Sequence, residues 1–142
     1  MHLIPIETEQ EAAVAILFAS IMNERLGLTE SEIEQLSRML VLSSKFKDHS
    51  LNDLTIKALS LQAEHGSKKV IESSAGLISE DFKETLFAMA CELITADGKV
   101  NDQESEILAM IALYMGLPME RMKMMLTTYL IRNRWNVEVL ER

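Results

Sequence analysis

The spacing of helix-capping residues is the feature that most constrains the fold of this chain. Three pairs of a capping residue with a glutamate three positions later stand ahead of apolar helical runs: Thr8 with Glu11, Thr29 with Glu32, and Asn101 with Glu104. This is the spacing of a capping box, in which the first side chain accepts a hydrogen bond from a free backbone N–H and the glutamate accepts one in return. Each box therefore predicts the start of a helix.

Glycine and proline mark the remaining helix boundaries. We expect helix C-termini at four glycines, which take a left-handed backbone without strain: Gly66, Gly76, Gly98 and Gly116. Pro118 suits a first helical turn. These signals predict helices over residues 8–26, 29–44, 50–65, 67–75, 79–96, 102–115 and 118–132. Only the tail from Trp135 to Leu140 shows strand-like alternation. The prediction is an all-α fold, a single-domain helical bundle of about seven helices over residues 1–142.

The predicted helices also indicate an internal repeat. A shift of 72 residues places Leu28 on Val100, Glu32 on Glu104 and Leu36 on Leu108, and it superimposes the apolar positions of the flanking helices. The shared order is an apolar helix, a tight turn, a glutamate and a second apolar helix. It predicts two copies of a helical hairpin, at about 11–44 and 83–116. The alternative is that any two amphipathic hairpins align this well.

Several features limit where the protein acts. No apolar run reaches the roughly 18–20 residues that span a bilayer, and the longest, Ala12–Met22, is well short of that. Glu7, Glu9 and Glu11 stand where a signal peptide has basic residues. A lone cysteine, Cys91, excludes an internal disulfide and suits a reducing compartment. We therefore expect a cytoplasmic protein with no membrane segment.

Charge and residue types limit the function class. The net charge of −8 makes a poor non-specific nucleic-acid binder, and it favours cations or a basic partner. The three histidines are scattered without a second ligand at helical spacing, and Cys91 lies among apolar residues without a neighbouring histidine. No phosphate-binding loop or nucleophile motif is present. We expect neither an enzyme nor a nucleic-acid-binding protein.

The segment Thr95–Glu104 joins two predicted helices and carries acids at fixed spacing. Asp97-Gly98 can simply form the turn while Glu104 closes the next helix cap. The same acids can instead hold a cation, because hard cations bind several converging oxygens. Aligned with a calcium-binding EF-hand loop, Leu93 occupies the first ligand position, so a self-contained calcium loop is not expected.

The sequence from Ala96 to Glu104, followed by Ile107-Leu108, Ile111 and Tyr114–Leu117, resembles the tellurite-resistance TerB-like family. The resemblance runs from about Glu11 to Leu130. It implies an all-helical fold built on two hairpins, a stress-response role, and acidic residues at the turns that bind metal.

On that basis three acids are carried over as ligands of a divalent cation of the calcium or magnesium type: Asp97, Glu104 and Glu32. The first copy departs from the family pattern. Asn23–Leu28 replaces the Asp-Gly turn, and Arg25 aligns with Asp97.

A methionine-rich C-terminal region suggests a second function. Six of the ten methionines lie in the last two predicted helices, and flexible thioethers suit a surface that accepts a partner helix or a second copy. The candidate interface residues are Met119, Met122, Met124, Met125 and Trp135. The alternative is that these methionines alternate between core and rim. Two hypotheses follow: a non-enzymatic cation-binding protein, or a helical interaction module or homodimer without a metal site.

Overall fold

The computed structural model describes residues 5–22 and 27–136, and within them it contains seven α-helices and no strand. The helices are α1 (Glu9–Met22), α2 (Glu30–Val41), α3 (Leu51–His65), α4 (Ser67–Ser74), α5 (Lys83–Ile94), α6 (Asp102–Met115) and α7 (Met119–Asn133). Two short 3-10 helices, η1 (Ser44–Phe46) and η2 (Ala75–Leu77), follow α2 and α4. The all-α prediction is confirmed. Of the possible tail strand, residues 137–140 lie outside the described ranges.

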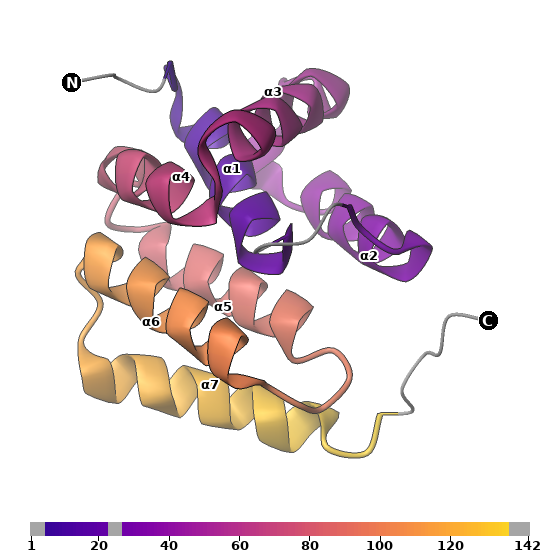
Figure 1. Cartoon of the computed structure of the whole chain (residues 1–142), viewed down its shortest axis with the longest axis vertical. Helices are drawn as coiled ribbons and strands as arrows, with labels where there is room; N and C mark the ends of the chain where they lie inside the picture. Colours follow the sequence, from indigo (N-terminus) through magenta and orange to yellow (C-terminus); the bar gives the residue numbers. More distant parts are fainter. Residues whose placement is uncertain (1–4, 23–26, 137–142) are drawn as a thin grey trace.

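Helix α1 is the centre of the structure. Every residue from Ala12 to Met22 is buried, because α1 packs against α3 and α4 on one side and against α5 and α6 on the other (Figure 1). A helix that is apolar on all sides is stable only inside a protein. Helices α3, α4, α5 and α6 therefore surround α1, whereas α7 packs on α5 and α6 and α2 packs on α5 and η1.

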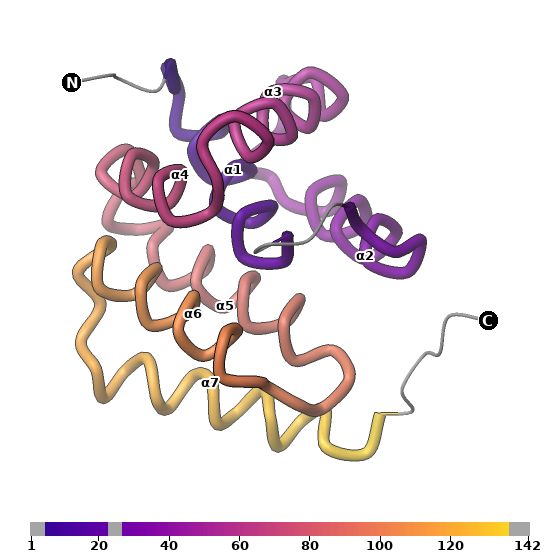
Figure 2. The backbone as a smooth tube through the Cα atoms, viewed as in Figure 1, coloured from indigo at the N-terminus to yellow at the C-terminus, as the bar shows by residue number. Residues whose placement is uncertain are grey.

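Helix α2 is only loosely packed against the helices around it. Helices α5, α6 and α7 lie side by side, whereas α2 stands to the side of α1 and α3 (Figures 1 and 2). Its main packing partners are α5 and η1. Helix α2 buries only Leu36 and Leu40, and so leaves part of α1 and α3 uncovered.

Most predicted helix boundaries lie within four residues of the observed ones. Helix α5 begins at Lys83 and not at residue 79, because the Ser79 hydroxyl and N–H both donate to the Glu9 carboxylate, at 2.7 and 2.9 Å. These bonds tie the segment before α5 to the start of α1. The predicted helix 29–44 ends at Val41, after which Ser43 caps η1. Residues 23–26 of the first predicted helix lie outside the described ranges.

Three of the predicted caps differ from expectation. Gly98 does not end α5, because the C-cap of that helix is Thr95, three residues earlier. Gly76 does not end a helix with a left-handed residue, because the chain passes from α4 into η2 through right-handed Ala75. The Thr8 hydroxyl accepts a hydrogen bond from the Glu11 N–H at 3.1 Å. The Glu11 carboxylate, however, accepts from the N–H of Glu7, the residue before Thr8, and not from Thr8 itself. The first box is therefore only half formed.

Each predicted copy of the hairpin contains two of the helices, α1 and α2 in the first copy and α5 and α6 in the second. Helices α3 and α4 and the two 3-10 helices lie between the copies along the chain. None of the described helices has the length and apolar content that crossing a membrane requires.

Candidate functional site

The turn between α5 and α6 carries Asp97 on the surface. One of its carboxylate oxygens, Oδ1, accepts a hydrogen bond from the Lys99 N–H at 3.0 Å. Aspartate often shapes turns in this way, by bonding its own backbone two residues on. The other oxygen, Oδ2, receives no hydrogen bond from any residue of the described ranges. Asp97 thus shapes the turn and still presents one oxygen to solvent.

Glu104 belongs to the cap of α6. Its Oε1 accepts from the Asn101 N–H at 3.0 Å, and Asn101 Oδ1 accepts from the Glu104 N–H at 2.8 Å. The predicted capping box is therefore confirmed. Substituting a cap residue of this kind typically costs about 0.5–2 kcal/mol of stability.

Glu32 has the same role at the start of α2. Its carboxylate accepts from the N–H and the hydroxyl of Thr29 at 3.0 and 3.2 Å, and Thr29 accepts in return from the Glu32 N–H. Arg25, which the repeat aligns with Asp97, lies outside the described residues. The two hairpins therefore start their second helices with the same hydrogen bonds.

The structure does not assemble the three predicted ligands into a metal-binding group. Within residues 5–22 and 27–136 no three side chains of His, Cys, Asp or Glu come together in a way that could hold a metal ion. Glu32 lies in the first turn of α2, whereas Asp97 lies in the α5–α6 turn and Glu104 in the first turn of α6. A cation at Asp97 would depend on Oδ2, on neighbouring oxygens and on water.

The Asp97-Gly98 turn also holds the end of α7. Gly98 has φ +81°, and a Cβ added there would lie 2.6 Å from the carbonyl oxygen of Asn133. The buried Asn133 amide donates to Thr95 Oγ1 at 3.0 Å, and Thr95 in turn donates to the carbonyl of Cys91 at 2.7 Å. Sequence reasoning missed this contact because no motif marks Asn133.

Asn136 extends the same network. Its Nδ2 donates to the carbonyl of Ala96 at 2.9 Å and to Asn133 Oδ1 at 3.0 Å. The turn between α5 and α6 is therefore fixed by side chains 40 residues further along the chain. Its glycine is explained by packing against α7, independently of any ligand.

The methionine-rich region divides into two sets. Met122 and Met125 are partly buried against the core, together with Tyr129. Met119 and Met124 are exposed, and Trp135 is 88% exposed. Packing of α7 on α5 and α6 explains the first set. The second set is accessible to a partner.

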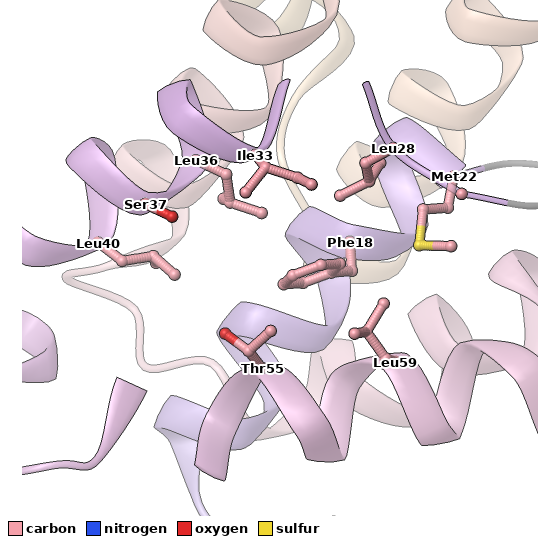
Figure 3. A pocket seen from close by; sticks show the side chains of 10 residues that line it. Phe18, Met22, Leu28, Ile33, Leu36, Ser37, Leu40, Thr55 and Leu59 are labelled. Carbon is pink, nitrogen blue, oxygen red and sulfur yellow. The ribbon is translucent and has the colours of Figure 1, made fainter. Parts of the chain in front are cut away.

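An apolar groove of about 330 Å³ lies between α1, α2 and α3. Figure 3 shows Phe18 of α1 at its centre, with Leu36 of α2 and Leu59 of α3 on opposite sides. Its lining is Phe18, Met22, Gly27, Leu28, Ile33, Leu36, Ser37, Leu40, Thr55 and Leu59. Sequence reasoning did not find this groove, because its residues have the same apolar spacing as ordinary core positions.

The walls of the groove differ in accessibility. Phe18, Leu36 and Leu40 are almost fully buried and form its floor, whereas Ile33 is 50% exposed and Leu59 is 39% exposed. Among the described residues, no charged side chain lines the groove. The polar side chains that line it in this part of the chain are Ser37 and Thr55, and neither hydroxyl bonds to another described protein atom.

Cys91 is a core residue. It is fully buried in α5, and this burial raises the pKa of its thiol to about 12. A thiol with this pKa is neutral at physiological pH and is a poor nucleophile. The expectation that Cys91 packs in the core agrees with its position.

A comparison with known families gives one match. The family model described as Tellurite resistance protein TerB matches residues 11–126, which include both hairpins and the first half of α7. The resemblance predicted from Ala96–Glu104 is thereby confirmed, over nearly the predicted extent. No curated protein and no solved structure matches the chain significantly.

Proposed function

The chain belongs to the TerB family, and from that premise we propose that it is a non-enzymatic cytoplasmic domain that binds a partner protein. The observation that carries the proposal is the groove between α1, α2 and α3. It is apolar, it has two exposed edge residues, Ile33 and Leu59, and it lies beside the loosely packed α2. Exposed apolar surface of this kind marks interaction sites in soluble proteins.

The non-enzymatic part of the proposal has its own support. The described residues that line the groove are two with hydroxyls, seven with apolar side chains and a glycine, so this part of the lining supplies no general acid or base. The one cysteine of the chain is buried and has a raised thiol pKa. These features suit recognition better than bond cleavage.

Cross-linking in the producing cell tests this function. A photoreactive p-benzoylphenylalanine is placed at Leu59, and at Leu113 of α6 as the matched control. Leu113 is 74% exposed but lies in a different part of the structure. We expect a discrete cross-linked protein from position 59 and none from position 113. No product at position 59, or the same products at both positions, would refute partner binding at the groove.

A second candidate function is divalent-cation binding at the α5–α6 turn. It is favoured by the solvent-facing Oδ2 of Asp97, since carboxylate oxygens are the ligands that calcium and magnesium prefer. The TerB match also spans this turn. In this proposal Asp97 and Glu104 contribute charge to one site, and Glu32 contributes to a separate one.

Thermal melts test the cation proposal. Chelator-treated protein is melted with and without calcium, magnesium, manganese or zinc, and binding to the folded state stabilises it by about 2.7 kcal/mol at a hundredfold excess over the dissociation constant. Asp97→Asn with Glu104→Gln removes both charges but keeps acceptors for the turn and the cap. We expect the double variant to lose the cation-dependent shift. An unchanged shift contradicts the site.

The family name suggests the biological setting. We propose that the domain serves a stress response of the tellurite-resistance type. Deleting the gene in its own host should then lower tellurite tolerance. Restoration by the wild type and not by a groove variant links that role to the groove, and unaltered tolerance argues against it.

A further inference from the structure

We infer that the groove between α1, α2 and α3 binds a basic amphipathic helix of a partner protein. This inference deepens the proposed function and rests on it. The partner helix has apolar side chains on one face, spaced over two helical turns, and lysine or arginine beside them.

The length of the groove matches a helix. Its α2 wall runs from Ile33 through Leu36 to Leu40, which is about 10 Å at 1.5 Å per residue. A helix laid into a groove anchors itself through apolar residues at positions i, i+3 or i+4, and i+7, which cover the same distance.

The apolar surface is wider than a small molecule would cover. Ile33 and Leu59 are each exposed at the groove edge, and Ile56 on the same helix as Leu59 is exposed as well. A small apolar ligand would occupy the space over Phe18 and leave the groove edge exposed to water. A helix seated across the groove covers both, and so buries more apolar area.

The charges beside the groove are complementary to a basic partner. Glu30 and Glu34 lie one helical turn apart on α2. They precede the groove-lining residue Ser37 by seven and three residues, so all three lie on the same side of the helix, along the edge of the groove. Arg38 is the neighbouring cation, and it pairs with Glu34 at 3.2 Å.

The surrounding segment has the same sign. Residues 5–65 carry ten acidic and five basic side chains. On α3, Lys57 is directed to Glu11 of α1, with 3.8 Å between nitrogen and oxygen. Together with Glu30 and Glu34 beside the groove, this acidic surplus favours a basic helix over an acidic one.

Fluorescence anisotropy tests the inference with a defined probe. The probe is a fluorescein-labelled peptide of about 14 residues, roughly four turns, with leucine at the anchor positions and lysine elsewhere. Two comparison peptides share its length: one has the same composition in an order that gives no apolar face, and one has glutamate in place of lysine. We expect saturable binding of the first peptide only.

Substitutions at the groove test whether the peptide binds there. Ile33→Gln with Leu59→Gln should keep the fold, since neither side chain is buried in the core, and should weaken binding by about tenfold or more, which is about 1.4 kcal/mol. The matched control, Leu113→Gln, makes the same change on α6 and should leave the affinity unchanged. Glu30→Gln with Glu34→Gln should weaken binding roughly threefold and reduce its salt dependence. Melting curves confirm that each variant folds.

Several results would overturn the inference. Equal binding of the reordered peptide would show that charge alone attracts the peptide. Equal binding of the glutamate peptide would show that the occupant need not be basic. Full affinity in the Ile33 and Leu59 double variant places the peptide elsewhere. Displacement of the peptide by a second copy of the chain makes the occupant a copy of this protein. If the Leu59 cross-link forms but no peptide binds, the proposed function stands and the basic helix is wrong.

Discussion

The hairpins α1–α2 and α5–α6 start their second helices alike but pack them differently. Both helices begin with a complete capping box, at Thr29 and at Asn101. Helix α6 then packs on α1, α4, α5 and α7 and buries five residues, Ile107, Leu108, Ile111, Ala112 and Met115. Helix α2 buries two, because it packs chiefly on α5 and η1 and stands off from α1 and α3. We call the second hairpin closed, because neighbouring helices cover the apolar side of α6, and the first open, because part of the apolar side of α2 stays uncovered.

The difference shows that capping and packing are set separately. The boxes fix where each second helix begins, since they satisfy backbone groups locally. Contacts with distant helices decide whether the apolar side of that helix is covered. In the order α1, α2, α3 the third helix leaves a groove, whereas in the order α5, α6, α7 it packs against both predecessors. We attribute the binding surface to this looser packing.

The largest expected effect comes from breaking the closed hairpin at Gly98. Gly98→Ala should lower the free energy of unfolding by about 3 kcal/mol, because the new Cβ meets the Asn133 carbonyl and the left-handed backbone adds strain. Gly116→Ala is the control: it has φ +74° but open space around it, and should cost only about 1–2 kcal/mol. Urea unfolding measures both, and equal losses would contradict the packing of the turn on α7.

A pH-dependent effect is expected where Glu9 joins α1 to the segment before α5. Desolvation alone would raise the pKa of Glu9, but hydrogen bonds from the side chain and N–H of Ser79 and from Lys45 outweigh it, so the net pKa is lowered. A lowered pKa in the folded state gives stability that is present above about pH 4.5 and is lost as the pH falls through the folded value.

The test is to compare Glu9→Gln with wild type across that range. At pH 7 the variant should be about 1–2 kcal/mol less stable, because it loses charged hydrogen bonds. The difference should shrink as the pH drops below 4.5. Denaturant curves at pH 7 and pH 3 measure it, and a gap of constant size at both would count against the ionised bond network.

Removing the two caps should sharpen the contrast between the hairpins. Asn101→Ala should lower the global stability by about 1 kcal/mol, since α6 is part of the core. Thr29→Ala should instead mainly speed amide exchange within α2, because a loosely packed helix opens locally without unfolding the rest. Calorimetry and hydrogen exchange separate the two effects, and equal drops in melting temperature would mean that α2 is as integrated as α6.

The smallest expected effect on stability is at the exposed methionines of α7. Met119→Glu with Met124→Glu should leave the melting temperature almost unchanged, because both side chains are exposed. Under the homodimer hypothesis the same change should shift sedimentation from dimer to monomer. A wild-type protein that is monomeric at all concentrations would remove that hypothesis.

The sequence predicted local structure better than surfaces. Glu32 and Glu104 mark helix starts because a capping box is a short-range pattern, and the TerB resemblance rests on a contiguous segment. Gly76 misled the prediction because a 3-10 helix can follow an α-helix without a left-handed residue. Phe18 and Leu36 have the spacing of core residues, so no pattern distinguishes a groove floor from a core. The contact of Gly98 with Asn133 joins residues far apart in sequence, and only the tertiary structure shows it.

Hydrogen exchange with and without the leucine–lysine peptide tests the central claim, that the open hairpin is the binding surface. Exchange is followed amide by amide in α2 and α3, with α6 as the internal reference. We expect saturating peptide to slow amide exchange in α2 and along the groove side of α3 and to leave exchange in α6 unchanged. Protection confined to α6 and α7, or no protection anywhere, would contradict it.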